Sequence, residues 1–187
     1  MSIADLHARA LASTGRFVAG VRDDQWHDDT PCEGMDVRDV VNHVVSGNLW
    51  VAPLVEGRTV EEVGDRYDGD VLGDDPSAAY DASAAPAGEA FHRPGALDAP
   101  CAVSYGPVPG HVYAGHRFLD VLVHGWDVAE ATGQDTTLDP ELVEACWALV
   151  QDQADMIRGS GVFGEEVPVP HDAPLQDRLL AFLGRRA

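Results

Sequence analysis

The segment from His111 to Ala131 carries polar side chains of the types and spacing that a metal site requires. At intervals of four, four and three residues come His116, Asp120, His124 and Asp127. In an α-helix these intervals place the four side chains, with Tyr113, within a sector of about 80° on one face. The rest of the segment is apolar, so this polar row faces either water or a polar site. Exposed faces elsewhere in the chain use Glu, Arg and Asp, and the two histidines therefore favour a polar site over a solvated face.

Asp120 and His124 form an i, i+4 pair, which brings a carboxylate oxygen and an imidazole nitrogen onto one turn of helix. Both side chains can then bind one divalent ion, at about 2.0 to 2.2 Å each. A third ligand is offered by His43, which lies apart from the valine stripe of a second helix. Gly47 follows one turn later and is expected to leave space beside the imidazole. The alternative for a single histidine on a helix is a purely structural role. The predicted ligand set is His43, Asp120 and His124.

Other residues are candidates for supporting roles. Asp127 and His116 are predicted to orient a ligand imidazole through its second nitrogen or to act as general acid and base. Asp127 has a helix-structural role as its alternative, and His116 is an alternative metal ligand. Trp50 and Trp126 are candidates for lining a substrate pocket, with membership of the core as their alternative.

Arginine and cysteine receive plainer interpretations. In so acidic a chain, surface ion pairs are expected for Arg38, Arg117 and Arg178, although each could anchor a carboxylate or a sugar hydroxyl of a ligand. Cys32 is interpreted as a small buried hydrophobe rather than a nucleophile, because no histidine lies at a recognisable spacing from it.

Apolar residues recur at helical spacing along most of the chain, which predicts an all-α fold. Thr30–Glu33 resembles a capping box, and Asp36 is expected to cap the helix that begins at Val37. Cys101–Tyr105 could form a short strand or hairpin arm. A glycine-rich G-x-G-x-x-G match at Gly159–Gly164 belongs to no βαβ unit and is interpreted as a loop. Helices are expected at about 2–21, 76–92, 111–131, 139–158 and 175–183, with a short helix and a loop between 59 and 76. A further helix is expected from Val37 until Pro53 and Gly57 end it.

Four long helices, a small irregular or hairpin insertion and a short C-terminal helix together predict a four-helix bundle. The expected organisation is a single domain over residues 1–187. Cofactor and metal sites in such bundles are built from side chains on facing helices. The polar row and His43 are therefore expected to meet inside the bundle.

The composition excludes several classes of partner. Among the 187 residues, 12 Lys+Arg stand against 32 Asp+Glu, a formal net charge of −20, and lysine is absent. Such a surface repels phosphate backbones and anionic lipid, so neither nucleic acid nor membrane is expected as a partner. Three scattered cysteines, no apolar leader and no long apolar run predict a cytoplasmic protein. The bundle could be a monomer or a homodimer.

Three stretches resemble a known family over nearly the whole chain and in matching order. They are TPCEGMDVRDVVNH at Thr30–His43, DVLVHGWDVAEATG at Asp120–Gly133 and APLQDRLLAFLGR at Ala173–Arg185. The resemblance is to actinobacterial metal-binding proteins of the DinB superfamily, with the mycothiol-dependent maleylpyruvate isomerases and the mycothiol S-transferases as the nearest characterised relatives. It implies a DinB-like four-helix bundle.

The resemblance also implies a metal site with one histidine on the second helix and a carboxylate-x3-histidine pair on a later one. These positions are His43, Asp120 and His124 in this chain. Relatives with known activity carry Glu where this chain has Asp120, and Trp is usual where it has Met35. The shorter carboxylate predicts a metal closer to its helix or held more weakly. The longer maleylpyruvate isomerases also have a C-terminal domain that this chain is expected to lack.

Two imidazoles and one carboxylate leave open positions on a divalent ion, which is typical of a catalytic site. Zn²⁺ is the first choice, with Ni²⁺, Fe²⁺ or Mn²⁺ as alternatives. A thiol bound there loses its proton. With the resemblance, this predicts a mycothiol-dependent (thiol-dependent) transferase or isomerase that acts on a small electrophile through a metal-bound thiolate. The alternatives are a non-catalytic metal-binding or regulatory protein, favoured by a shallow site, and a metal-dependent hydrolase, which requires Asp127 or His116 as a base.

Overall fold

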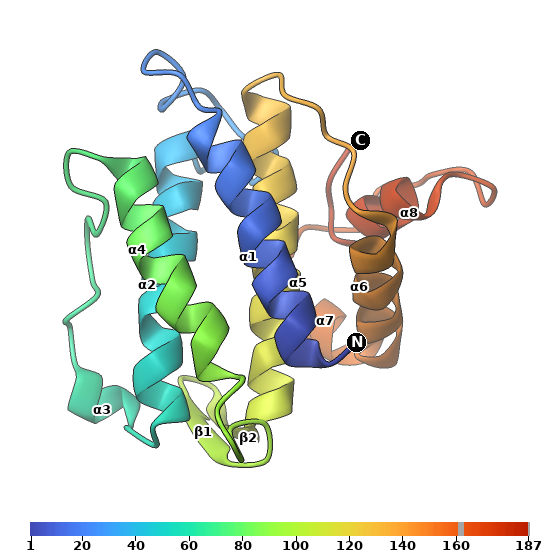
Figure 1. The fold of residues 1–187 in the computed structure, drawn as a ribbon. Helices are drawn as coiled ribbons and strands as arrows, with labels where there is room; N and C mark the ends of the chain where they lie inside the picture. The colour runs from blue at the N-terminus through green and yellow to red at the C-terminus, as the bar shows by residue number, and fades with distance from the viewer. Residues whose placement is uncertain (161–162, 187) are drawn as a thin grey trace.

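Four long helices form a bundle, as predicted. The computed structural model describes residues 1–160 and 163–186, without the side chain of Ser160. In Figure 1 the long helices run side by side, with α1 against α4 and α5, and α2 against the same two helices. The prediction of an all-α, DinB-like four-helix bundle is confirmed. The helices are α1 (Ile3–Ala19), α2 (Val37–Val55), α4 (Pro76–Ala90) and α5 (Gly110–Ala131).

Smaller elements surround the bundle. An antiparallel hairpin lies at one end, where Cys101 pairs with Val108, and it contacts α2 and α5. The helices α6 (Pro140–Asp152), α7 (Ala154–Ser160) and α8 (Leu175–Phe182) lie beside α5, on the side away from α2 and α4 (Figure 1). Within the described part of the chain, no helix has both the length and the apolar character that a membrane span needs. The hairpin consists of β1 (Pro100–Val103) and β2 (Gly106–Pro109), and the remaining small element is the helix α3 (Val60–Val63).

The start of α2 follows from local hydrogen bonding. The Asp36 carboxylate accepts from the backbone N–H of Asp39 at 2.8 Å, and the Asp39 carboxylate accepts from that of Asp36 at 3.3 Å. This capping box satisfies donors that the first turn leaves free. One face of α2 then buries Val37, Val40, Val41, Val44 and Val45.

Two local predictions differ from the structure. Thr30–Glu33 caps no helix, because the Thr30 hydroxyl accepts from the N–H of Cys32 at 3.2 Å and donates to the carbonyl of Met35 at 2.8 Å, which closes a turn. The helix expected over 139–158 is divided at Gln153 into α6 and α7. The helix α2 ends at Val55, between Pro53 and Gly57, the two residues expected to end it, and Pro53 is tolerated near the helix end because it removes only its own N–H. Part of the Gly159–Gly164 match lies outside the described residues.

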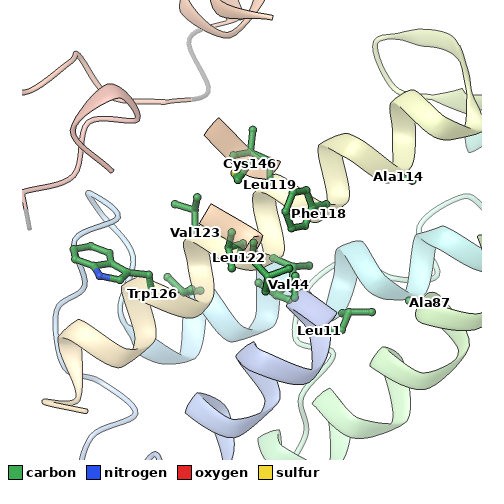
Figure 2. Packing of buried hydrophobic residues seen from close by; sticks show 14 of the residues in the cluster. Leu11, Val44, Ala87, Ala114, Phe118, Leu119, Leu122, Val123, Trp126 and Cys146 are labelled. Atoms are coloured by element: carbon green, nitrogen blue, oxygen red, sulfur yellow. The ribbon is translucent and has the colours of Figure 1, made fainter. Parts of the chain in front are cut away.

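Close packing of α1 on α5 sets the orientation of the polar row. Figure 2 shows Phe118, Leu119, Leu122, Val123 and Trp126 of α5 among the buried side chains of neighbouring helices. A Cβ at Gly125 would lie 2.2 Å from the Thr14 hydroxyl, which instead donates to the carbonyl of Val121 at 2.8 Å. The absence of a side chain at Gly125 therefore lets α1 cover this face of α5.

His7 is a polar residue inside the apolar core. Its ring is fully buried and forms a T-shaped pair with Phe91, at a centroid distance of 5.2 Å. Neither ring nitrogen has a hydrogen-bond partner among the described residues. Burial lowers the pKa of His7 to about 3, and the nearby charge of Arg117 acts in the same direction. His7 is therefore neutral in the folded protein at neutral pH.

His7→Leu is expected to reduce the pH dependence of stability. Because the pKa of His7 lies below its unfolded value of 6.5, the unfolded chain binds the extra proton as pH falls from 6.5 towards 3. The wild type therefore loses up to about 1.4 kcal/mol of unfolding free energy per pH unit in that window, and the variant is spared this loss. Urea unfolding at pH 7 and pH 5 measures the difference. The exposed-site variant His171→Leu is the control, and an unchanged pH dependence in His7→Leu would contradict the expectation.

Candidate metal centre

The middle of α2 and of α5 brings His43, Asp120 and His124 together. Oδ1 of Asp120 lies 3.0 Å from Nε2 of His43 and 3.5 Å from Nε2 of His124. The two imidazole rings are 4.9 Å apart at an interplanar angle of 71°. One nitrogen or oxygen from each residue lies within 4.8 Å of the others. Both residues of the i, i+4 pair on α5 thus face the histidine of α2.

The three residues fit a divalent ion. Donors that each lie about 2.1 Å from one ion are separated from one another by roughly 3 to 3.5 Å. The two separations from Asp120 Oδ1 are of this size. Two imidazoles with one carboxylate suit first-row divalent ions such as Zn²⁺. Both the donor types and the spacing therefore suit a divalent metal ion.

Arg117 holds the second oxygen of Asp120. Its Nη1 donates to Asp120 Oδ2 at 2.8 Å, and its Nη2 donates to Asn48 Oδ1 at 3.1 Å and to the carbonyl of Val44 at 3.3 Å. Burial would raise the pKa of Asp120, but the Arg117 charge and the His43 hydrogen bond outweigh it and hold that pKa well below its usual range. Asp120 is therefore ionised, with Oδ1 on the side of the imidazoles.

The space at Gly47 has a different use from the predicted one. A Cβ at Gly47 would lie 2.2 Å from Nη1 of Arg117. The glycine therefore makes room for the guanidinium that binds Asp120, and the expectation that it leaves a gap for an ion or ligand is wrong. The expected surface ion pair of Arg117 is also wrong, because only 8% of this residue is exposed.

Two further charged residues, Asp127 and Arg185, fix the orientation of His124 from its Nδ1 side. Its Nδ1 lies 3.0 Å from Oδ2 of Asp127, which is completely buried. Arg185, just after α8, donates to both oxygens of Asp127, at 3.2 Å from Nε and 2.9 Å from Nη2. Burial opposes ionisation of Asp127, but the hydrogen bonds from His124 and Arg185 outweigh it and lower its pKa. An ionised Asp127 can only accept, so Nδ1 carries the proton and Nε2 is left to face Asp120.

Cys32 lies close to the same histidine. Its sulfur forms a second group with His124 and Asp127, whose ligand atoms lie within 4.8 Å of one another. Oδ2 of Asp127 is already bonded to Nδ1 of His124, and both Asp127 oxygens accept from Arg185. These atoms are therefore less available to an ion than those of the first group. Burial raises the pKa of the Cys32 thiol. Cys32 is half-buried beside a histidine, which its sequence spacing did not indicate.

A polar cleft adjoins the centre at His43. It has a volume of about 460 Å³, within the range of small-molecule sites. A larger groove of about 880 Å³ lies between α1 and α4, and half of its lining residues are alanine or glycine. None of the three donor residues lines that groove. The cleft is lined by Gly34, Met35, Asp39, Asn42, His43, Ser46, Tyr67, Asp68 and Gly69.

Comparison with known proteins identifies the family of the chain. Residues 7–129 match the family model described as the mycothiol maleylpyruvate isomerase N-terminal domain. The chain belongs to this family. It is also 42% identical, over 96% of its own length and 95% of theirs, to two proteins of Mycobacterium tuberculosis, from strains CDC 1551 / Oshkosh and H37Rv, both described as uncharacterized. No solved structure matches the chain.

In this member of the mycothiol maleylpyruvate isomerase family, the matched region contains all three donor residues and Asp127. Arg185 lies outside it and reaches the centre only through the fold. Sequence reasoning missed Arg185, and it gave Arg117 a surface role. The one available signal was that Arg117 precedes Asp120 by three residues on the helix, a spacing that permits an ion pair.

His116, Trp50 and Trp126 contact residues other than the three donors. Nδ1 of His116 accepts from the Tyr105 hydroxyl at 2.5 Å, and its Nε2 donates to Gln153 at 3.3 Å. Trp126 is buried in the core, with 1% exposed. Trp50 is half-buried and packs edge-on against Tyr67, which lines the cleft, at 5.8 Å between rings. Trp50 thus contacts a residue of the cleft wall, whereas Trp126 belongs to the core.

Proposed function

We propose that this protein is a cytoplasmic, divalent-metal-dependent transferase or isomerase that uses a small thiol, mycothiol, to act on a small electrophile. His43, Asp120 and His124 hold the ion, with Zn²⁺ as the first choice. A divalent ion at this position supplies one thing to the reaction, a lowered pKa for a thiol that binds it. The membership in a mycothiol-related family supports the choice of thiol.

The proposal rests on a donor set that is held in place by hydrogen bonds and that borders a cleft. The His43 side chain is 46% exposed, that of Asp120 is 22% exposed and that of His124 is 10% exposed. Arg117 and Asp127 fix the two inner donors, and His43 lines the cleft. A closed structural site would need no such access.

Charge at the centre favours an anionic sulfur. Asp120 is neutralised by Arg117, and Asp127 is neutralised by Arg185. The charge of a divalent ion is therefore left uncompensated by the protein. A thiolate supplies the missing negative charge, and burial of the surrounding groups strengthens this attraction.

A hydrolase is less well supported. That reaction needs a base beside the open position, for which the candidates were Asp127 and His116. Both oxygens of Asp127 are occupied by Arg185 and His124. Both nitrogens of His116 are occupied by Tyr105 and Gln153.

Elemental analysis followed by calorimetry with mycothiol on the same sample tests the proposal. We expect about one equivalent of a divalent metal, and saturable mycothiol binding that disappears after chelation of the metal. The cobalt-substituted protein should show a changed visible spectrum when mycothiol is added. Metal without mycothiol binding in either assay would instead indicate a non-catalytic metal-binding protein.

A further inference from the structure

The free charge on the wall of the cleft is negative. Asp39 and Asp68 both line it, and none of its nine described lining residues is an arginine. Asp68 is exposed, and its side chain forms no hydrogen bond or ion pair within the described part of the chain. The loop that carries Asp68 adds exposed carboxylates at Asp65 and Asp74, whereas Asp70 is paired with Arg38 and Asp75 caps α4.

Two arginines near the cleft are already engaged, and a third, Arg66, is exposed in the loop but does not line the cleft. Arg38 donates to Asp70 at 2.8 Å and to the carbonyl of Gly73 at 2.9 Å. Arg117 is buried against Asp120 and Asn48. No lysine exists anywhere in the chain. An anionic group that enters the cleft would therefore meet carboxylates without a free guanidinium or ammonium among its described lining residues.

Two neutral polar side chains of the cleft, those of Asn42 and Ser46, also form hydrogen bonds that hold its shape. Asn42 donates to the carbonyl of Gly69 at 3.0 Å and accepts from the N–H of Val71 at 2.9 Å. Ser46 donates to the carbonyl of Tyr67 at 3.1 Å. These bonds fix the loop against α2. The position of Asp68 on the wall is thus set by contacts on both sides of it in sequence.

His43 joins the cleft to the donor set, because it belongs to both. It is also the most exposed of the three donors. A ligand whose sulfur reaches the open side of the centre would therefore place the rest of its structure in the cleft, between α2 and the loop.

We propose that this cleft selects thiols whose remaining part is neutral and rich in hydroxyls, or positively charged, and that it rejects anionic ones. This inference rests on the proposed function, since it assumes that a thiol reaches the centre. Hydroxyl and protonated amino groups can donate hydrogen bonds to Asp39 and Asp68, and any cation is attracted to their charge, whereas a ligand carboxylate or sulfonate faces like charge. A dicarboxylate such as maleylpyruvate would be repelled in the same way as an electrophile entering by this cleft.

Three thiols of matched length test the selectivity with the cobalt-loaded full-length protein. They are thiocholine, 2-mercaptoethanol and 2-mercaptoethanesulfonate, which carry a positive, a neutral and a negative group two carbons from sulfur. The sulfur-to-cobalt absorption band reports each dissociation constant. We expect thiocholine to bind on the order of 10-fold more tightly than the sulfonate at low salt. The ratio should shrink in 1 M NaCl, where the screening length is about 3 Å.

The variant Asp68→Asn isolates the carboxylate. It should reduce the ratio between thiocholine and the sulfonate several-fold, mainly by tightening the sulfonate. Asp152→Asn, an exposed position on α6 on the other side of α5 from α2, is the matched control and should leave the ratio unchanged. Equal affinities of the three thiols, or a ratio insensitive to salt and to Asp68→Asn, would overturn the inference alone. Absence of the band with all three thiols would overturn the thiol-binding function as well.

Discussion

His43→Ala is expected to abolish metal loading while leaving the metal-free protein folded. Removal of one donor should weaken binding by more than the 10- to 100-fold that is usual for loss of an outer-shell partner. The fold should survive because the His43 side chain is 46% exposed and faces the cleft rather than the core. Elemental analysis and competition with a chelator measure the affinity, and thermal unfolding of the stripped protein measures the fold.

Two matched variants make this result decisive. His171→Ala removes an exposed histidine that belongs to neither candidate group and should keep full metal content. Cys32→Ser removes the sulfur of the second group and should also keep it. Loss of metal in Cys32→Ser together with retention in His43→Ala would move the site to the Cys32, His124 and Asp127 group. Unchanged metal in His43→Ala would refute the proposed ligand set.

Asp127→Ala is expected to lower both stability and metal affinity. It leaves the Arg185 guanidinium at 6% exposure without its carboxylate. Loss of one partner of a buried ion pair costs about 3 to 5 kcal/mol of unfolding free energy. It also removes the acceptor of His124 Nδ1, which should weaken metal binding about 10- to 100-fold. Urea unfolding of the metal-free protein and chelator competition measure the two effects separately.

A double variant separates orientation from folding. Asp127→Leu with Arg185→Leu leaves no buried charge unpaired, so stability should recover towards the wild-type value. Metal affinity should stay low, because His124 still lacks its acceptor. Arg186→Leu, an exposed neighbour, is the control for the loss of one positive charge. Wild-type metal affinity in the double variant would show that Asp127 acts on the fold and has no part in orienting His124.

Much of the candidate site could be predicted from the sequence because helical periodicity is a local property. The spacing of Asp120, His124 and Asp127 determines that they share a face of α5, whatever packs against it. The break in the valine pattern of α2 likewise separated His43 from the valine stripe. The long helices followed from apolar spacing, and the hairpin was foreseen only as a possibility because two four-residue strands carry little pattern.

What the tertiary structure decided are the contacts between residues distant in sequence. Arg185 meets Asp127 across 58 residues, and Arg117 reaches Asn48 across 69. Cys32 comes to lie beside His124 by way of a turn that the sequence pattern assigned to a helix start. No periodicity encodes such pairings, since they depend on how α2, α5 and the segment after α8 pack together.

Charge shows the difference between what the sequence determines and what the fold determines. The sequence by itself determined a net charge of −20 and a row of histidines and aspartates on one helix. Only the fold decided which carboxylates are neutralised by buried arginines, Asp120 and Asp127, and which remain free on the wall of the cleft, such as Asp68. The physical reason is that Coulomb energy depends on distance and burial, and both are set by packing rather than by composition.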